Sequence, residues 1–160
     1  MIRSATLNDA ASICNIYNYY IKNTVVTFEE ETVSVETMQQ RIREITAKHH
    51  WLVYEENGVI LAYAYAGEWK SRCAYRFSLE VTIYGAHDMP KRSGIAHKLY
   101  DALLENLDNT IHSVIAVIAL PNEASIGLHE KLGFKQVAHF KEVGFKQNKW
   151  IDVGNWQKML

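Results

Sequence analysis

Residues 91–120 read KRSGIAHKLYDALLENLDNTIHSVIAVIAL, a basic turn followed by a predicted helix and a predicted strand. The helix begins at Gly94, and its apolar side chains recur at helical spacing on one face: Ile95, Leu99, Ala102 and Leu103. Val114–Leu120 is almost wholly apolar, as in a strand that is buried on both faces. Because another strand is predicted just before this stretch, at Tyr75–Tyr84, the order strand, helix, strand predicts a crossover between parallel strands.

The other predicted elements complete a single mixed α/β domain that spans residues 1–160. Asn57-Gly58 predicts a hairpin turn because both residues tolerate positive φ, and Gly133 predicts the end of a short helix. The remaining elements are strand Ile2–Ala5, a helix through Ile13–Ile21 capped by Thr6 or Asn8, a helix capped by Ser34, strands Trp51–Tyr54 and Val59–Ala66, helix Ser125–Leu132, and strands Gln136–Val143 and Ile151–Met159. We expect about six to seven strands in one mixed sheet, with helices on both faces.

The charge balance argues against nucleic acid as the main partner, since 17 Lys and Arg residues face 18 Asp and Glu residues, for a formal net charge of -1. No apolar run approaches the ~20 residues of a membrane helix, and the first residues lack the pattern of a signal peptide. The two cysteines, Cys14 and Cys73, lie far apart and have neither metal-ligand nor disulfide-framework spacing. We therefore expect a cytoplasmic protein with no membrane, nucleic-acid or metal partner.

The turn Lys91-Arg92-Ser93-Gly94-Ile95-Ala96 is a candidate phosphate site. The first turn of a helix leaves four backbone N–H groups without partners, and the helix dipole adds positive potential there. The small residues at positions 94 and 96 would let phosphates approach the backbone, and Lys98 adds further charge. The alternative is an ordinary helix N-terminus with solvated basic side chains. Neither the P-loop pattern nor the dinucleotide-binding glycine pattern is present.

A second stretch, PNEASIGLHEKLGF at residues 121–134, follows the predicted buried strand. Together the two stretches resemble the paired motifs of the GNAT acyltransferase superfamily, Gln/Arg-x-x-Gly-x-Gly/Ala and, about 25 residues later, Asn-x-x-Ala/Ser-x-x-x-Tyr/His-x-x-x-Gly-Phe. Over nearly the whole chain the sequence is similar to the phosphinothricin N-acetyltransferase group, which includes methionine sulfone and sulfoximine acetyltransferases. The similarity includes residues 16–18, 27–31, 74–76, 80, 83–84, 124–126, 128–129, 142–144 and 150–152.

The phosphate loop departs from the usual sequence of this group. Arg92 stands where Gly is usual, Ser93 where Arg or Lys is usual, Lys91 replaces Arg or Gln, and Ala96 replaces the final Gly. The loop between Glu80 and Gly94 is also slightly longer than usual. The side-chain contacts to the cofactor therefore stay open, whereas the backbone donors depend on position rather than on side-chain type.

The resemblance implies acetyl-CoA as the cosubstrate and no metal. In this superfamily the pantetheine arm enters where two parallel strands splay, so backbone groups of Ile83, Tyr84 and Gly85 would pair with it. The diphosphate would be held by the backbone N–H groups of Lys91, Arg92, Ser93, Gly94, Ile95 and Ala96. Near the reactive end of the cofactor, the resemblance implies contacts from Asn122 and Ser125.

Acetyl transfer to an amine by direct attack needs a base for the amine and benefits from a proton for the leaving thiolate. The resemblance assigns Glu80 as the general base, acting through water. The alternative is a structural carboxylate paired with Arg76 or Arg72. His129 stands where many members have the Tyr that protonates the thiolate, and the alternative is a helix histidine packed beneath the cofactor. Cys73 has no evident base or orienting partner for a nucleophilic role.

The acceptor in this group is a small amino acid or analogue with a free α-amine. Its pocket has six candidate residues: Phe28, Glu30, Arg72, Cys73, Ala74 and Tyr75. Arg72 or Arg76 would pair the acceptor's carboxylate bidentately. The alternative for Phe28 and Tyr75 is packing in the core. For the acidic run Glu29–Glu31, the alternative is a solvated loop.

Two functions other than small-molecule acetylation remain open from the sequence. A non-catalytic acyl-CoA-binding module would bind acetyl-CoA but acetylate no amine. An enzyme of the same fold that acetylates protein lysines or N-termini would need an open groove beside the acceptor site. The phosphinothricin acetyltransferase group is generally dimeric, so we also expect a homodimer with Trp150 as a candidate for its interface.

Overall fold

The computed structural model describes residues 1–90 and 93–160; Lys91 and Arg92 of the predicted phosphate loop lie outside the described residues. The chain divides into two compact units. The first comprises residues 1–19, 33–67 and 82–108, and the second comprises residues 20–32, 68–81 and 109–160. Strand β4 (Ser78–Gly85) contributes residues to both units.

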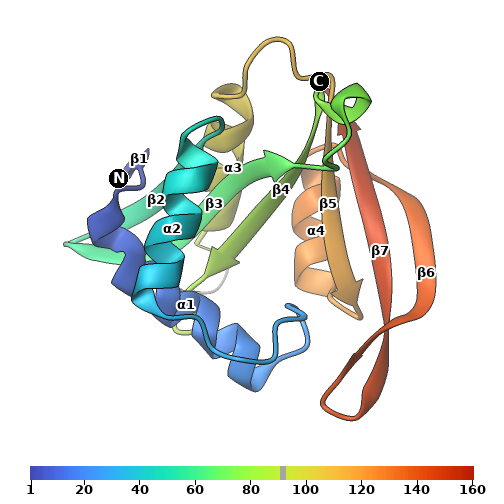
Figure 1. Cartoon of the computed structure of the whole chain (residues 1–160), viewed down its shortest axis with the longest axis horizontal. Coiled ribbons are helices and arrows are strands. Elements are labelled where there is room, and N and C mark those ends of the chain that lie inside the picture. The colour runs from blue at the N-terminus through green and yellow to red at the C-terminus, as the bar shows by residue number, and fades with distance from the viewer. Residues whose placement is uncertain (91–92) are drawn as a thin grey trace. The chain divides into compact units, whose positions relative to one another are not determined.

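The element types follow the predicted order, and the strands are hydrogen-bonded in the order β1-β2-β3-β4-β5-β7-β6 (Figure 1). The other strands are β1 (Ile2–Ser4), β2 (Trp51–Glu56), β3 (Val59–Glu68), β5 (Ser113–Leu120), β6 (Lys135–Lys146) and β7 (Lys149–Met159). The helices are η1 (Leu7–Asp9), α1 (Ala10–Asn23), α2 (Val35–Thr46), η2 (Cys73–Tyr75), α3 (Ile95–Glu105) and α4 (Glu123–Lys131). Within the described ranges, none of these helices is long and apolar enough to cross a membrane. Parallel and antiparallel pairs both occur, so the predicted mixed α/β fold is confirmed.

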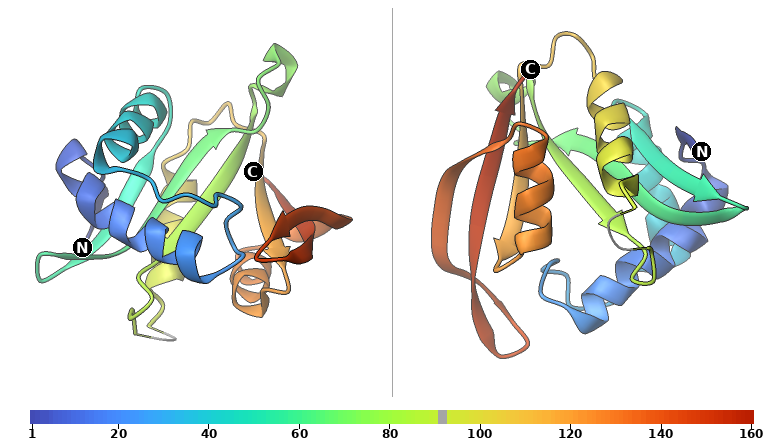
Figure 2. Two further views of the ribbon diagram at one scale, coloured as in Figure 1. Left: turned by 60° about the horizontal axis from the view of Figure 1, so that its bottom comes forward. Right: turned by 180° about the vertical axis from the view of Figure 1, so that it is seen from behind.

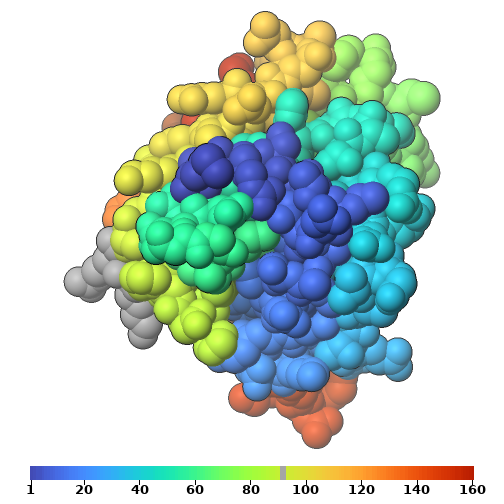
Figure 3. Space-filling model, turned by 90° about the vertical axis from the view of Figure 1, so that its left-hand side faces the viewer, coloured from blue at the N-terminus to red at the C-terminus, as the bar shows by residue number. Residues whose placement is uncertain are grey.

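In the first unit, β1, β2 and β3 pair antiparallel. The turn between β2 and β3 is the predicted one, where Asn57 and Gly58 have φ angles of 51° and 79°. Two left-handed residues in succession match the twist of a two-residue hairpin. β1 adds to β2 with Ile2 opposite Tyr54, and the hairpin tip lies next to the N-terminal residues on the face seen in Figure 3.

Helices cover both faces of the sheet in the first unit (Figures 1 and 2). The part of α1 up to Tyr19 and all of α2 lie over one face, and α3 lies over the other. Each helix has buried apolar residues at the predicted spacing: Ile13 and Ile16 in α1, Met38 and Ile42 in α2, and Leu99 and Leu103 in α3. The helical periodicity of the sequence therefore identified the inward faces correctly.

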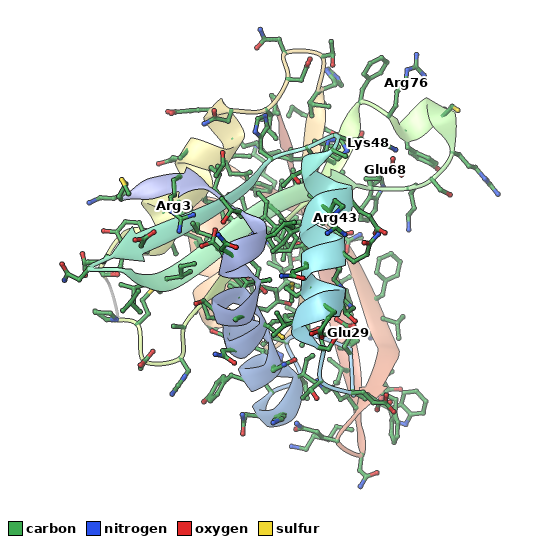
Figure 4. All side chains as sticks on the ribbon, turned by 60° about the vertical axis from the view of Figure 1, so that its left-hand side comes forward. Arg3, Glu29, Arg43, Lys48, Glu68 and Arg76 are labelled. Carbon is green, nitrogen blue, oxygen red and sulfur yellow. The ribbon has the colours of Figure 1, made fainter. Side chains whose placement is uncertain are left out.

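Arg3 ties β1 to two other elements of the first unit (Figure 4). Its guanidinium forms ion pairs with Asp9 at 2.7 Å and with Glu55 at 2.6 Å. Asp9 also accepts a hydrogen bond of 2.7 Å from the backbone N–H of Thr6 at the start of η1. Hydrogen bonding to Arg3, opposed in part by burial, lowers the pKa of Asp9 to about 2. The N-terminal strand is therefore anchored by charge as well as by strand pairing.

In the second unit, β5 lies between β4 and β7. β4 runs parallel to β5, with Ser78–Glu80 opposite Ser113–Ile115, which confirms the predicted parallel pair. β7 runs antiparallel along the whole of β5, and β6 pairs with β7 in a long hairpin (Figure 1). α4 packs against β5, on the side that faces the viewer in the right-hand view of Figure 2.

The strand predicted at Tyr75–Tyr84 was wrong at its N-terminal end, because β4 begins only at Ser78. Residues 73–75 form the short helix η2 instead. The backbone N–H of Tyr75 donates to Arg72 O at 3.0 Å, so turn hydrogen bonds satisfy this backbone locally and no ladder is needed. β5 also departs from the prediction, since Val117 is 43% exposed and the strand is not buried throughout.

The last two strands are longer than predicted. The sequence predicted strands over residues 136–143 and 151–159, whereas β6 extends to Lys146 and β7 begins at Lys149. The two residues between them, Gln147 and Asn148, have φ angles of 52° and 57°. They form a tight left-handed turn without glycine, and this is why the sequence pattern did not reveal it.

Candidate active site

The N-terminus of α3, in the first unit, has the geometry predicted for a phosphate site. Gly94 precedes the helix with φ of 76°, a left-handed conformation that glycine adopts without strain. No described atom lies within 4 Å of the position that a Cβ of Gly94 would take. The one first-turn amide with a side-chain acceptor among the described residues is that of Ile95, 3.4 Å from Ser93 Oγ. The backbone N–H of Lys98 already donates to Gly94 O at 3.0 Å, so the amides of Ala96 and His97 are the ones that fit an anion such as a diphosphate.

Ile83, Tyr84 and Gly85 form the end of β4 and are half-buried in the first unit. The Tyr84 ring packs edge-on against Tyr17, with ring centroids 5.3 Å apart. A side chain at Gly85 would collide with Met89, whose Cε lies 2.7 Å from the position that a Cβ would take. The side chains of Tyr17 and Met89 therefore pack against this strand end.

In the second unit, the pairing between β4 and β5 stops well before β5 ends. The last paired residues are Glu80 and Ile115, although β5 continues to Leu120. Beyond Ile115, and among the described residues, β5 has register partners only in β7. The opposite edge of β5 therefore has backbone groups that an extended ligand arm can pair with. The end of this parallel pairing agrees with the splay expected where the pantetheine arm enters, and the pairing of residues 83–85 with that arm stays a prediction.

Asn122 caps the N-terminus of α4, in the second unit. Its Oδ1 accepts a hydrogen bond of 3.1 Å from the backbone N–H of Ser125. Because an Asn side chain also has two N–H donors, the Nδ2 group is available to donate to a ligand. Both residues are half-buried. Their hydrogen bond brings together, at this helix start, the two cofactor contacts that were predicted for this part of the chain.

His129 is buried in α4, one helical turn after Ser125. Its Nδ1 donates a hydrogen bond of 2.7 Å to Ser125 O, since a carbonyl oxygen only accepts. Its ring packs edge-on against Phe134, with ring centroids 5.2 Å apart. Burial lowers the pKa of His129, which favours the neutral imidazole. These contacts favour the packed histidine among the two predicted roles, and the role as proton donor stays a prediction.

Glu80 is half-buried on β4, at the point where pairing with β5 ends. Burial raises the pKa of its carboxyl group, and the charge of Lys70 lowers that pKa in part. No arginine of the described residues lies within ion-pair distance of Glu80, and the guanidinium of Arg76 stacks over Phe77 at 4.3 Å (Figure 4). The structural pairing with Arg76 or Arg72 is therefore absent from the described part of the chain. The role as general base stays a prediction.

The six acceptor candidates lie in two segments of the second unit. Phe28 and Glu30 are exposed in the segment between α1 and α2, and residues 72–75 are exposed in and just before η2. Phe28 and Tyr75 are 43% and 44% exposed, so core packing was the wrong interpretation of both. Among the described residues, no hydrogen bond or ring contact joins Phe28 or Glu30 to residues 72–75. Their common role in binding an acceptor stays a prediction.

Two lysines of the second unit were missed by the sequence analysis. Lys70 places its charge near Glu80. Lys146 of β6 is buried and donates a hydrogen bond of 2.8 Å to Thr27 O. The sequence contained little indication that Lys146 is buried. Its spacing of two from Gly144 shows only that both residues lie on one face of a strand. In the described ranges, no group of three or more His, Cys, Asp or Glu side chains could hold a metal ion.

Comparison with known sequences identifies the family. The family model described as Acetyltransferase (GNAT) domain matches residues 2–154. The chain belongs to the GNAT acetyltransferase family, as its paired motifs predicted. A curated relative, phosphinothricin N-acetyltransferase of Streptomyces viridochromogenes, is 39% identical over 158 residues, which are 98% of this chain and 86% of the relative.

Two solved structures are also similar over the whole chain. The crystal structure of ribosomal-protein-alanine N-acetyltransferase from Brucella melitensis has a TM-score of 0.96 at 32% identity, and the match covers 100% of this chain and 99% of that one. A phosphinothricin acetyltransferase from Sinorhizobium meliloti, in complex with AcCoA, has a TM-score of 0.93 at 33% identity and covers 100% of this chain and 88% of that one. The predicted fold and the predicted acetyl-CoA-dependent N-acetyltransferase are confirmed.

Proposed function

We propose that this protein acts as one acetyltransferase domain that transfers the acetyl group of acetyl-CoA to the amine of a small amino acid or analogue. The phosphinothricin acetyltransferases from S. viridochromogenes and S. meliloti, at 39% and 33% identity, support this acceptor class. The observation that carries the proposal is Glu80, a half-buried carboxylate with a raised pKa at the point where β4 and β5 stop pairing. A base in this position would lie near the thioester end of the bound pantetheine arm.

In this proposal, backbone groups hold the cosubstrate. The N–H groups of residues 93–96 at the start of α3 would bind the diphosphate, and those of Lys91 and Arg92 are proposed from the sequence alone. Backbone groups of residues 83–85 would pair with the pantetheine arm, and Asn122 Nδ2 would donate near the thioester, with Ser125 beside it. When bound, acetyl-CoA supplies the activated acetyl group.

The acceptor amine must lose a proton before it can react, because an ammonium group has no lone pair. Glu80 would accept this proton through a water molecule. Burial raises the pKa of the Glu80 carboxyl group, which makes it a better base than a carboxylate in water. The amine nitrogen would then attack the thioester carbonyl directly, so that the enzyme gains its rate from positioning and forms no covalent intermediate.

His129 would contribute packing rather than a proton. Its Nδ1–H is engaged by Ser125 O, and burial favours its neutral form. A neutral imidazole whose N–H is already hydrogen-bonded to a carbonyl oxygen is a poor general acid. We therefore assign His129 to the support of α4, beneath the helix start that presents Asn122.

The acceptor would lie between the exposed candidates of the second unit. Phe28 and Glu30 would contact its side chain and amine, and Cys73, Ala74 and Tyr75 would shape the pocket. The guanidinium of Arg72 or Arg76 would pair with its carboxylate. A bidentate contact of this kind would select amino acids over simple amines.

A protein N-terminus is the second candidate for the acceptor. The B. melitensis structure, at 32% identity, is named a ribosomal-protein-alanine N-acetyltransferase, which favours this alternative. The two acceptors differ at the carboxyl group, since a peptide with N-terminal alanine has an amide where a free amino acid has a carboxylate. An enzyme that pairs an arginine with this carboxylate would acetylate the free amino acid and leave the peptide unmodified.

The test is release of free thiol from acetyl-CoA by the purified protein. The acceptor panel contains free amino acids, methionine sulfone, methionine sulfoximine, phosphinothricin, polyamines and a peptide with N-terminal alanine. We expect turnover with one or more of the amino acids or analogues, and a loss of about 100-fold or more in kcat for Glu80→Gln with acetyl-CoA binding retained. Acetyl-CoA binding without turnover of any acceptor would instead identify a non-catalytic binding module.

We further propose that the enzyme is a cytoplasmic homodimer, since acetyl-CoA is consumed inside cells. The hairpin of β6 and β7 supports an interface, because several large apolar side chains on it are exposed: Val137, Phe140, Val143, Phe145 and Trp150. A group of apolar side chains of this kind is typical of a protein interface. Light scattering of the wild type should give the mass of two chains, and Trp150→Ser should shift it toward one.

A further inference from the structure

Residues 24–30, here called the acceptor segment, are fastened to the β6–β7 hairpin within the second unit. Lys146 Nζ donates a hydrogen bond of 2.8 Å to Thr27 O. At the hairpin turn, Gln147 Nε2 lies 3.4 Å from Thr24 O. Carbonyl oxygens of the acceptor segment are therefore held by side chains of a hairpin that lies more than a hundred residues further along the chain.

Lys146 is an unusual lysine, since it is only 4% exposed. Removing an ammonium group from water has a large cost unless other groups compensate it. Here Thr27 O accepts its hydrogen bond, and the charges of Glu30 and then Glu29 favour the ammonium form, although burial lowers the pKa of Lys146. A buried ion of this kind adds little stability relative to an apolar side chain, but it fixes the orientation of the carbonyl that it binds.

Gly144 lies on the same face of β6, two residues before Lys146, and it is buried as well. A Cβ at Gly144 would stand 2.4 Å from two carbons of the Phe28 ring. The Phe28 ring therefore packs directly against the backbone of Gly144, and any side chain at position 144 would collide with it. Phe28 is nevertheless 43% exposed, so one side of the ring is fixed by β6 while the other is open to a ligand.

We infer that Gly144 and Lys146 are positioning residues for the amine acceptor, because they hold Phe28 and Glu30 in the orientation that receives it. This inference rests on the proposed function, in which Phe28 and Glu30 bind the acceptor. Neither Gly144 nor Lys146 needs to touch the substrate. Their substitution therefore alters the binding of the acceptor and leaves the binding of acetyl-CoA unchanged.

The first test is Gly144→Ala, whose new methyl group displaces the Phe28 ring. We expect KM for the best acceptor of the panel to rise about tenfold or more, with KM for acetyl-CoA within about twofold of wild type. Gly67→Ala is the matched control, since a Cβ there meets no described atom within 4 Å. An unchanged KM for the acceptor, or equal rises for both substrates, would refute the inference.

The second test shows whether Gly144 acts through Phe28. Phe28→Ala removes the ring that the new methyl group would meet, so Gly144→Ala should have almost no additional effect in the Phe28→Ala background. The double variant also relieves the collision, and it therefore remains informative where Gly144→Ala alone does not fold. Additive effects of the two substitutions on KM for the acceptor would exclude a common route and overturn the inference.

The third test is Lys146→Met, with the exposed Lys135→Met on the same strand as control. Methionine is an unbranched side chain only one atom shorter than lysine, but it cannot donate a hydrogen bond to Thr27 O. We expect a higher KM for the acceptor without a lower temperature of unfolding, because a buried ion is replaced by an apolar group. A stability loss with unchanged acceptor KM would assign Lys146 a structural role only. If wild type acetylates no member of the panel, the proposed function fails, and this inference fails with it.

Discussion

Asn122 Oδ1 accepts a hydrogen bond of 3.1 Å from the backbone N–H of Ser125, and Asn122 Nδ2, the proposed donor to acetyl-CoA, takes no part in this bond. Asn122→Asp separates these two functions, because aspartate keeps the accepting oxygen but has no N–H. We expect a temperature of unfolding close to that of wild type and a Kd for acetyl-CoA raised about tenfold. Isothermal calorimetry with acetyl-CoA and a thermal melt measure both quantities.

Asn122→Ala is the companion variant, since alanine removes the cap and the donor together. Its free energy of unfolding should fall by about 1 kcal/mol, the usual effect of a lost N-cap, and acetyl-CoA should bind as weakly as in Asn122→Asp. Wild-type affinity for acetyl-CoA in both variants would show that Asn122 only caps the helix.

Lys70 lies near Glu80, the proposed general base, and its charge affects the pH at which that carboxyl group ionises. Its positive charge lowers the pKa of Glu80, whereas burial raises it. Because the unprotonated carboxylate is the active form, kcat/KM should rise with pH through this pKa. Lys70→Met removes the charge, so the acidic limb of the profile should move to higher pH while the plateau at alkaline pH stays within about twofold of wild type. The exposed Lys22→Met is the control, and an unmoved acidic limb would mean that another group is the base.

His129→Asn tests the assignment of this residue to packing. Asparagine keeps an N–H that can donate to Ser125 O, so the contact at 2.7 Å can be retained. We expect kcat to stay within about fivefold of wild type, since a general acid would contribute roughly 100-fold or more. Single-turnover acetyl transfer, measured from neutral to alkaline pH, gives the answer. A 100-fold loss would restore His129 as the proton donor to the thiolate.

Asp9 makes the free energy of unfolding depend on pH in the acidic range. Its pKa is about 2 in the folded chain against 3.8 for a free aspartate, chiefly through hydrogen bonding to Arg3. A carboxyl group with a depressed pKa stabilises the fold above its unfolded pKa, and this contribution is lost as the pH falls through the folded pKa. Asp9→Asn should lower the free energy of unfolding by about 2 kcal/mol at neutral pH, with the difference from wild type vanishing in strong acid.

Denaturant melts of wild type and Asp9→Asn between neutral and strongly acidic pH provide the measurement. Glu105→Gln, a change at an exposed carboxylate of α3, serves as the control. A difference between Asp9→Asn and wild type that stays constant with pH would show that shape, not charge, is what Asp9 contributes.

Much of the fold was predictable because its signals are local. The inward faces of α1, α2 and α3 follow from the spacing of apolar residues, and the turn at Asn57-Gly58 follows from two residues that tolerate positive φ. The errors also have local causes. Tyr75 belongs to η2 rather than to the predicted strand, because turn hydrogen bonds satisfy the backbone at this point.

In the candidate site, too, some features could be predicted from local sequence and others could not. The helix start at Gly94 was predicted correctly, because the open amides of a first turn are a property of a few consecutive residues. The next helix was predicted from Ser125, whereas α4 begins at Glu123 with Asn122 as its N-cap. The family followed from the resemblance of two motifs, at residues 91–96 and 122–134, and of nearly the whole chain. By contrast, the sequence left open whether Glu80 pairs with an arginine and whether Phe28 and Tyr75 are core residues.

Those alternatives were decided only by tertiary structure. Burial and the charge of Lys70 set the pKa of Glu80, and neither can be read from spacing along the chain. Lys146 and Thr27 are 119 residues apart, yet a hydrogen bond joins the Lys146 ammonium group to Thr27 O, directly before Phe28. Hydrophobic periodicity and capping chemistry are written into neighbouring residues, whereas solvation and contacts between distant segments exist only once the chain has folded.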